Sequence, residues 1–204
     1  MVAKIGLMGG TFDPIHYGHL LAAEVARWTF ALDKIIFIPA AVPPHKADRK
    51  KITSASCRLA MTGQAIASNP HFYLSDLELK RQGPSYTVDT VREIKRLYPQ
   101  NQIYFITGAD AIMEILTWNR VEELMSLAYF ITATRPGFKL ERLWDYLQNF
   151  PWKERVQIME IPGLAISSTE IRQRVQAGQP VKYLVPEAVE NYIYQQKLYQ
   201  DLSE

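Results

Sequence analysis

The sequence predicts an α/β protein whose sheet is doubly wound, mostly parallel and flanked by helices. Short apolar runs alternate with segments of helical periodicity along the whole chain, which is typical of parallel βαβ units. The apolar runs are almost continuous, as in strands that are covered on both faces. We expect a single domain over residues 1–204, because a chain of this length can bury a sizeable core.

The apolar runs are the candidate strands, and they span residues 5–8, 35–38, 72–74, 103–106, 129–132 and 156–159. Pro39 ends the second run. In a sheet of this class, ligands bind at the carboxyl ends of the strands, near the point where the strand order reverses. The turns after the first, fourth and last runs are therefore the expected positions of a binding site.

The segments between these runs have helical spacing, and they span residues 20–28, 56–67, 87–98, 122–128, 140–150, 171–177 and 186–198. In residues 87–98, apolar side chains recur at three-residue steps before Pro99 ends the pattern. Pro151 ends the helix expected at 140–150, and Pro186 is expected in the first turn of the last helix.

The composition excludes several classes of protein. Apolar residues make up 48% of the chain and charged residues 22%, as in ordinary globular domains. A net charge of +2 gives no global field for nucleic acid or an anionic membrane. The single cysteine, Cys57, excludes an internal disulfide and a cysteine metal cluster, and it is expected to be a buried, reduced thiol. With no signal peptide and no apolar stretch of ~18 residues, we expect a cytoplasmic protein.

The most informative motif is the stretch 9–19, GGTFDPIHYGH, which joins the first strand to the first helix. Gly9 and Gly10 allow a sharp turn and a close approach of the backbone to a ligand. The helix start offers free N–H groups to an anion, and His16 and His19, which flank Gly18, can donate to phosphate oxygens. The pattern is neither a Walker A loop nor a dinucleotide fingerprint. The alternative is a plain strand–turn–helix with incidental histidines.

The turn after the fourth strand reads Thr107-Gly108-Ala109-Asp110. Gly108 allows close approach of a ligand to the backbone. The Asp110 carboxylate could accept a hydrogen bond from a ribose hydroxyl or an amine. The residues alone favour Asp110 as the N-cap of a helix, since aspartate is among the best caps and an apolar run follows.

Further polar and aromatic groups could complete a substrate site. Trp118 is either a core residue or a flat face on which an aromatic ring stacks. The segment 84–90, PSYTVDT, opens a helix whose N–H groups suit a carboxylate, although it is also an ordinary Ser/Thr-rich helix start. Arg135 follows the fifth strand and is either a ligand for a substrate anion or a solvated side chain.

The segment 166–172, ISSTEIR, contains the Ser-x-x-Glu spacing of a capping box in Ser167 and Glu170, which predicts a helix from Ser168. A capped helix start still leaves N–H groups free, with Thr169 and Arg172 in its first turn. The fork of an arginine binds phosphate oxygens in pairs. This end of the chain is therefore a second candidate phosphate site.

Together these motifs resemble the H-x-G-H nucleotidylyltransferase superfamily. The run from Gly10 to His19 is similar to its first signature, and the run from Ile166 to Arg172 to its second. Within the superfamily, residues 84–90, Trp118, Pro43-Pro44-His45-Lys46 and the chain end 184–193 resemble bacterial nicotinate-nucleotide adenylyltransferases. The resemblance covers Gly9 to Tyr199 and implies a Rossmann-like nucleotidylyltransferase fold.

The resemblance implies transfer of the adenylyl group of ATP to nicotinate mononucleotide, with Mg²⁺ arriving on ATP and no metal site made by the protein alone. The implied catalytic residues are His16, His19 and Arg172. The implied ATP-binding residues are Gly9, Gly10, Thr11, Phe12, Gly18, Gly108, Asp110, Ser167, Ser168 and Thr169. The implied mononucleotide-binding residues are Lys46, Tyr86, Thr87, Trp118, Asn119 and Arg135. Asn119 stands where family members often carry an aromatic residue or a histidine.

Two alternative functions remain compatible with the sequence. The shared ATP motifs would also suit a sister enzyme that uses nicotinamide mononucleotide or phosphopantetheine. A nucleotide-binding sensor that has lost turnover is the alternative from another class, and the intact His16, His19 and Arg172 argue against it. The sequence predicts no nucleic-acid or membrane partner, and it leaves a homo-oligomer open.

Overall fold

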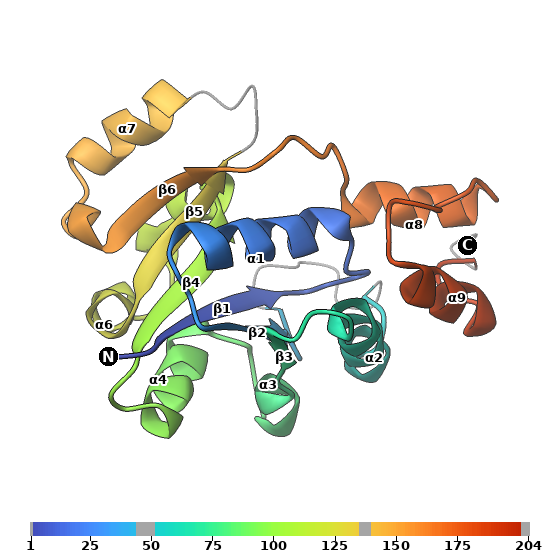
Figure 1. The fold of residues 1–204 in the computed structure, drawn as a ribbon, viewed down its shortest axis with the longest axis horizontal. Coiled ribbons are helices and arrows are strands. Elements are labelled where there is room, and N and C mark those ends of the chain that lie inside the picture. Colours follow the sequence, from blue (N-terminus) through green and yellow to red (C-terminus); the bar gives the residue numbers. More distant parts are fainter. Residues whose placement is uncertain (1, 44–51, 135–139, 201–204) are drawn as a thin grey trace.

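The computed structural model describes residues 2–43, 52–134 and 140–200 (Figure 1). Its centre is a six-stranded parallel sheet with the order β3-β2-β1-β4-β5-β6. The strands are β1 (Lys4–Gly10), β2 (Lys34–Pro39), β3 (Phe72–Leu74), β4 (Gln102–Gly108), β5 (Tyr129–Thr134) and β6 (Val156–Glu160). The predicted doubly wound α/β class is confirmed.

The strand order reverses at β1, which pairs with β2 on one side and with β4 on the other. Leu7 is opposite Ile36 of β2 and Phe105 of β4. In open parallel sheets, the connections diverge to opposite faces at such a point, which leaves a crevice beyond the carboxyl ends of the strands. The crevice here is therefore expected beyond Gly10 and Gly108.

Helices cover both faces of the sheet (Figure 1). One core packs against α1 (Tyr17–Thr29), α2 (Ala55–Ile66), α8 (Ser168–Gln176) and α9 (Glu187–Gln195). The other packs against α3 (Leu77–Lys80), α4 (Thr87–Leu97), α5 (Ala109–Met113), α6 (Val121–Leu127) and α7 (Leu140–Gln148). The short 3₁₀ helices η2 (Ile115–Thr117) and η3 (Lys153–Arg155) complete the labelled elements.

Several expected boundaries were wrong. Gly9 and Gly10 are not in a turn, because β1 continues through Gly10 and pairs with β2 as far as Pro39. The first helix begins at Tyr17, three residues earlier than expected, so His19 lies in its first turn. Pro186 is the N-cap of α9 rather than a residue of its first turn. The short elements α3, α5 and η2 were missed, since so few residues carry no clear periodicity.

Within the described ranges, none of the helices combines the length and the apolar character that crossing a bilayer would require.

Candidate active site

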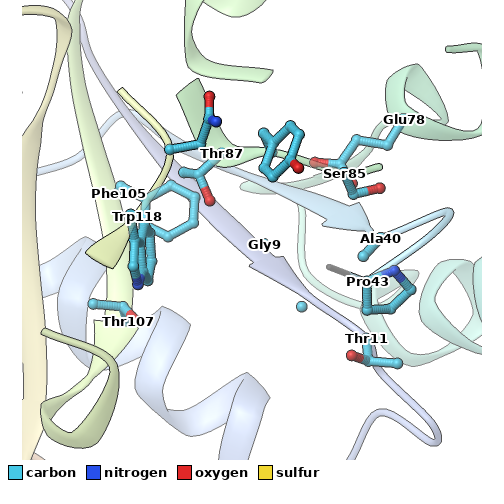
Figure 2. A pocket seen from close by; sticks show the side chains of 13 residues that line it. Gly9, Thr11, Ala40, Pro43, Glu78, Ser85, Thr87, Phe105, Thr107 and Trp118 are labelled. Atoms are coloured by element: carbon cyan, nitrogen blue, oxygen red, sulfur yellow. The ribbon is translucent and has the colours of Figure 1, made fainter. Parts of the chain in front are cut away.

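A cavity of about 230 Å³ opens beyond the carboxyl ends of β1 and β4 (Figure 2). In Figure 2, Trp118 and Phe105 stand at one end of this cavity, and Ala40 and Pro43 at the other. The cavity is lined by Gly9, Gly10, Thr11, Ala40, Pro43, Glu78, Ser85, Tyr86, Thr87, Phe105, Thr107, Trp118 and Asn119. It lies at the reversal of strand order, where the fold class places its ligands.

The indole of Trp118 forms one wall of the cavity, and its orientation is set by two buried phenylalanines. The Phe105 ring meets it edge-on at 6.1 Å between ring centroids, and the Phe130 ring does so at 6.4 Å. Edge-to-face contacts of this kind hold an aromatic ring in one orientation. Trp118 is half-buried, so an aromatic ligand could stack on its remaining surface.

Another wall of the cavity comes from the start of α4. Tyr86 is the N-cap residue of this helix, and its side chain makes no capping hydrogen bond. The first N–H groups of a helix have no acceptor within the helix, so those at Thr87 and beyond suit an anionic group of a ligand. Ser85 fixes this wall: its N–H donates to Val42 O at 3.0 Å, and its hydroxyl accepts from Val42 N at 3.2 Å.

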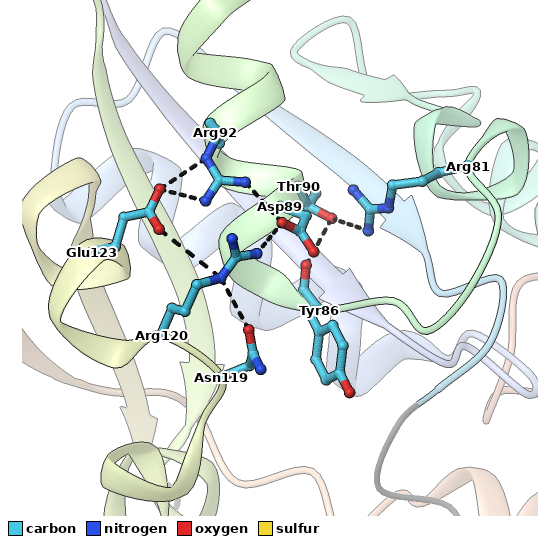
Figure 3. A network of polar contacts seen from close by, with 8 residues as sticks. All are labelled: Arg81, Tyr86, Asp89, Thr90, Arg92, Asn119, Arg120 and Glu123. Atoms are coloured by element: carbon cyan, nitrogen blue, oxygen red, sulfur yellow. Dashed lines mark hydrogen bonds and ion pairs between the residues drawn. The ribbon is translucent and has the colours of Figure 1, made fainter.

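A network of ion pairs joins the two walls (Figure 3). Asp89 in the first turn of α4 accepts from Arg92 at 2.8 Å and also pairs with Arg120, which directly follows Trp118 and Asn119 in the chain. Glu123 of α6 accepts from Arg92 Nε at 2.8 Å. The network ties the turn that carries Trp118 to the start of α4. It therefore fixes the distance between the stacking face and the free amides.

Glu78, which lines the cavity, belongs to a second polar cluster. Its Oε1 accepts from the Thr90 hydroxyl at 2.6 Å, and that hydroxyl accepts from Arg81 Nη2 at 3.1 Å. Glu78 is buried and paired through Thr90 with a cation. This cluster supports α4 from below, although nothing in the sequence pattern had singled out Glu78.

The two histidines lie together at the start of α1, and neither is among the residues that line the cavity. His16 is the N-cap residue, and the two imidazole centroids are 3.7 Å apart. The His16 backbone N–H donates to His19 Nδ1 at 3.2 Å. Gly18 leaves room for this arrangement, because a Cβ there would lie 3.0 Å from His16 Nδ1. The Phe12 ring is buried and meets the His19 ring edge-on at 5.1 Å.

Both histidines are neutral near pH 7. Burial lowers the pKa of His16 to about 4. Burial, with a smaller contribution from His16, lowers the pKa of His19 well below its usual range. In a neutral imidazole one nitrogen accepts and the other carries the proton. Because His19 Nδ1 accepts from the backbone, its proton is on Nε2, which can donate to a ligand.

The predicted helix start at Ser168 is confirmed, and it contacts the histidine motif. Ser167 is the N-cap of α8, and its hydroxyl accepts from Glu170 N at 3.1 Å. Arg172 Nη1 donates to Asp13 O at 2.7 Å, and Nη2 donates to Thr169 Oγ1 at 3.2 Å. Two of its five N–H groups are thus used within the protein, and the other donors could bind a phosphate.

The Ser168 hydroxyl completes this contact by donating to Pro14 O at 2.9 Å. Residues 13–14 precede the histidines, while Ser168 and Arg172 lie more than 150 positions later in the chain. The fold therefore brings the two signature segments into direct hydrogen-bond contact. Arg172 therefore contacts the segment that leads into the two histidines.

The predicted site residues fall into four groups. Seven line the cavity: Gly9, Gly10, Thr11, Tyr86, Thr87, Trp118 and Asn119. Another group surrounds the start of α1 and is formed by Phe12, His16, Gly18, His19, Ser167, Ser168, Thr169 and Arg172. Lys46 and Arg135 lie outside the described residues.

Gly108 is the last residue of β4, and Asp110 is the second residue of α5. Neither residue lines the cavity. The alternative of Asp110 as N-cap was wrong, because Gly108 is the N-cap of α5 and Asp110 lies exposed in its first turn. The expectation of a fully buried Cys57 was also wrong, since this free thiol is only half-buried in α2.

Six lining residues were not among the predicted site residues, although Pro43, Ser85 and Thr107 belong to segments that the sequence had singled out. The six are Ala40, Pro43, Glu78, Ser85, Phe105 and Thr107. Phe105 and Thr107 lie at the end of a predicted strand, and Ala40 follows Pro39, so position at a strand end was a usable signal for these three. Glu78 and Pro43 reach the cavity only through tertiary packing.

Comparison with known proteins relates this geometry to a family. Residues 7–174 match the model of the cytidylyltransferase-like family. A protein of Moorella thermoacetica, described as a probable nicotinate-nucleotide adenylyltransferase, is 56% identical over 199 residues, which covers 96% of this chain and 91% of that protein. A protein of Desulfitobacterium hafniense (strain Y51) with the same description is 52% identical over 198 residues, which covers 96% and 95%.

Solved structures give the same result. The nicotinic acid mononucleotide adenylyltransferase of Plasmodium falciparum, complexed with NaAD, superposes with a TM-score of 0.79 at 26% identity and covers 97% of both chains. The same enzyme complexed with APC gives a TM-score of 0.77 at 25% identity. With its strand order, its two signature segments in contact and relatives of this similarity over nearly its whole length, the chain belongs to the nicotinate-nucleotide adenylyltransferases of the cytidylyltransferase-like family.

Proposed function

We propose that this protein binds ATP and nicotinate mononucleotide and joins them into nicotinate adenine dinucleotide. The 5′-phosphate of the mononucleotide attacks the α-phosphorus of ATP, the bond to the β-phosphate breaks, and pyrophosphate leaves. The observation that carries the proposal is the contact between the two signature segments, in which Arg172 donates to Asp13 O at 2.7 Å beside the paired histidines.

The reaction needs no nucleophile from the protein, because the mononucleotide phosphate supplies it. Catalysis then consists of positioning the two phosphates and stabilising the charge that develops between them. We assign this second task to His16 and His19. As neutral imidazoles they serve as directed N–H donors rather than as cations, and the Nε2–H of His19 is the donor whose tautomer the backbone fixes.

The remaining residues bind the rest of the two substrates. We assign the β- and γ-phosphates to Arg172 and to the N–H groups of Ser168 and Thr169 at the start of α8. The backbone of residues 9–12, with Gly18, Gly108 and Asp110, is assigned to ATP. We place the pyridine ring on Trp118 and its carboxylate at the start of α4, near Tyr86, Thr87 and Asn119. Lys46 and Arg135 are kept as candidate ligands for the mononucleotide.

Mg²⁺ would arrive with ATP and be held chiefly by its phosphate oxygens, as is usual for this ion. Bound there, it would neutralise part of the charge of the leaving pyrophosphate. Asp13 is the carboxylate next to the histidine motif, and both of its oxygens already accept hydrogen bonds, from Tyr199 and from Thr53 N. We therefore do not assign Asp13 to the metal.

A pyrophosphate-release assay with a panel of acceptors tests this function. The purified protein is incubated with MgATP and nicotinate mononucleotide, nicotinamide mononucleotide or phosphopantetheine. We expect rapid release with nicotinate mononucleotide. Faster release with one of the other two would establish a sister enzyme, and binding of ATP without release for any acceptor would establish a sensor.

A further inference from the structure

The segment 13–17, which leads into the helix of the paired histidines, is held in place by the C-terminal part of the chain. Arg172 binds the carbonyl of Asp13, and the N–H of Tyr17 donates to Leu184 O at 3.1 Å. Both contacts reach the backbone of the segment. Neither contact involves the side chain of Asp13.

The Asp13 carboxylate is buried, with 3% of the residue exposed, and it links three parts of the chain. Its Oδ1 accepts from the Tyr199 hydroxyl at 2.8 Å, and its Oδ2 accepts from Thr53 N at 3.3 Å. The buried Arg58 guanidinium is nearby and donates to Thr11 O at 2.7 Å. A buried carboxylate that loses one of its donors is strongly disfavoured, so each donor constrains where the segment can lie.

Tyr199 reaches Asp13 because the chain turns back after α9. Lys197 and Tyr199 both have left-handed backbone angles, with φ of 51° and 65°. Such angles are costly for residues other than glycine and persist only where the surrounding contacts compensate. Here the compensation is the burial of the Tyr199 ring in the core shared by α1, α2 and α9, and the hydrogen bond of its hydroxyl. Figure 1 shows α9 beside α2.

The Tyr199 hydroxyl is a permanent donor. Burial, followed by the adjacent Asp13 carboxylate, raises the pKa of Tyr199 far above its usual range. The hydroxyl of Tyr199 therefore keeps its proton near neutral pH. The hydrogen bond from Tyr199 to Asp13 therefore positions the carboxylate and does not transfer a proton.

We propose that Tyr199 is a positioning residue for the phosphate site: its hydroxyl fixes the Asp13 carboxylate, and through Asp13 it fixes the segment from which His16 and His19 project. Tyr199 touches no substrate in this scheme. The effect of Tyr199 on turnover rests on the adenylyl transfer proposed above. Its effect on the position of the histidine segment does not. Because small displacements of a catalytic group cost large factors in rate, loosening this segment lowers turnover.

The test is Tyr199→Phe, which removes one oxygen and keeps the ring. We expect kcat to fall about tenfold or more, with the KM for nicotinate mononucleotide within twofold of wild type, because the pyridine cavity is built from other segments. Hydrogen exchange, measured at equal distance below each protein's Tm, should accelerate in a peptide that covers residues 13–20 and stay unchanged in a peptide from β4.

Tyr194→Phe is the matched control. Tyr194 lies on α9 with 42% of the residue exposed, so its variant should match wild type in kcat and in exchange. If Tyr199→Phe keeps its kcat and the exchange of residues 13–20, or if it loses its fold altogether, the positioning role is wrong. In the second case Tyr199 is a structural residue only.

A double-mutant cycle separates an effect through Asp13 from an effect elsewhere. In the Asp13→Ala background, Tyr199→Phe should change kcat by much less than in wild type, because the acceptor through which the hydroxyl acts is gone. Additive effects would contradict the proposal. Should the wild-type protein fail to release pyrophosphate, the proposed function falls, and the exchange of residues 13–20 still decides the role of Tyr199.

Discussion

At the residue scale, the chemistry of the site depends on which nitrogen of His19 carries the proton. The His16 backbone N–H occupies Nδ1, so Nε2–H is the donor that we expect to meet the transferring phosphate. His19→Ala removes this donor, and we expect kcat to fall by about 10²-fold or more, the scale found on losing a preorganised donor. Steady-state kinetics at saturating MgATP and nicotinate mononucleotide measure the kcat of both proteins.

His71→Ala is the control for this change, because His71 is exposed and lies just before β3, away from the cavity lining. It should retain wild-type turnover. Near-normal kcat in purified, folded His19→Ala would remove His19 from the mechanism.

Also at the residue scale, His16 makes stability depend on pH. Its pKa is about 4 in the folded protein because of burial, against about 6.5 in an unfolded chain. Between these values the unfolded state binds a proton that the folded state does not. The free energy of unfolding therefore falls as the pH drops from about 6.5 towards 4, by up to about 1.4 kcal/mol per pH unit for this histidine.

Urea unfolding of wild type and His16→Gln at several pH values between 4.5 and 7 measures this effect. The wild-type curve should be the steeper of the two, while His71→Gln should follow wild type. Parallel curves for wild type and His16→Gln would show that His16 is not held neutral by burial.

At the element scale, α8 presents Arg172 from its first turns to the histidine segment. The planar fork of this side chain binds Asp13 O and Thr169 Oγ1 and keeps further donors free. Arg172→Lys keeps the charge but loses the paired geometry. We expect the Kd for MgATP to rise about tenfold, which is the loss of about one charged hydrogen bond. Isothermal titration calorimetry measures the Kd without turnover.

Arg174→Lys is the matched control on the same helix, because Arg174 is partly exposed and pairs with Glu170 at 3.1 Å. It should bind MgATP as wild type does. Equal affinities of Arg172→Lys and wild type would mean that Arg172 holds the two segments together without binding phosphate.

At the scale of the whole molecule, the acceptor cavity is assembled from β1, the residues after β2, the start of α4 and the turn at Trp118. The nearby cations Arg92 and Arg120 are paired with Asp89 and Glu123. Among the residues that the structure describes, amides rather than a free positive charge are therefore expected to bind the carboxylate of nicotinate mononucleotide.

The amide form of the acceptor would turn its own NH₂ towards these N–H groups, which costs about 1–3 kcal/mol for each unpaired donor. We therefore expect kcat/KM for nicotinate mononucleotide to exceed that for nicotinamide mononucleotide by at least about two decades. Measuring both acceptors at one MgATP concentration gives the ratio. A ratio near one would show that the cavity does not read the carboxylate.

A substitution that removes one backbone N–H tests whether the start of α4 causes this preference. Thr87 is the first residue of α4, where proline is tolerated, and Tyr86 has φ −76° and ψ 131°, which suit a residue before proline. Thr87→Pro removes one N–H and should reduce the ratio about tenfold. Thr87→Ala keeps the N–H and should preserve the ratio. Equal ratios in the two variants would place the discrimination elsewhere.

The sequence by itself determined the class of the sheet, the position of the motifs at strand ends and the start of α8. These features depend on local physics: apolar runs form strands, and Ser167 caps a helix. Periodicity reports such short-range preferences directly. It could not give the short helices or the exact N-cap of α5, because a few residues carry too little pattern.

Only the tertiary structure decided which distant groups meet. Glu78 reaches the cavity through α3, Phe105 and Phe130 orient Trp118, and the neutrality of His16 follows from burial that no motif encodes. The contact of Tyr199 with Asp13 joins residues 186 positions apart. Nothing local to either residue specifies such a pair, because it exists only once the sheet and the C-terminal helices have packed around it.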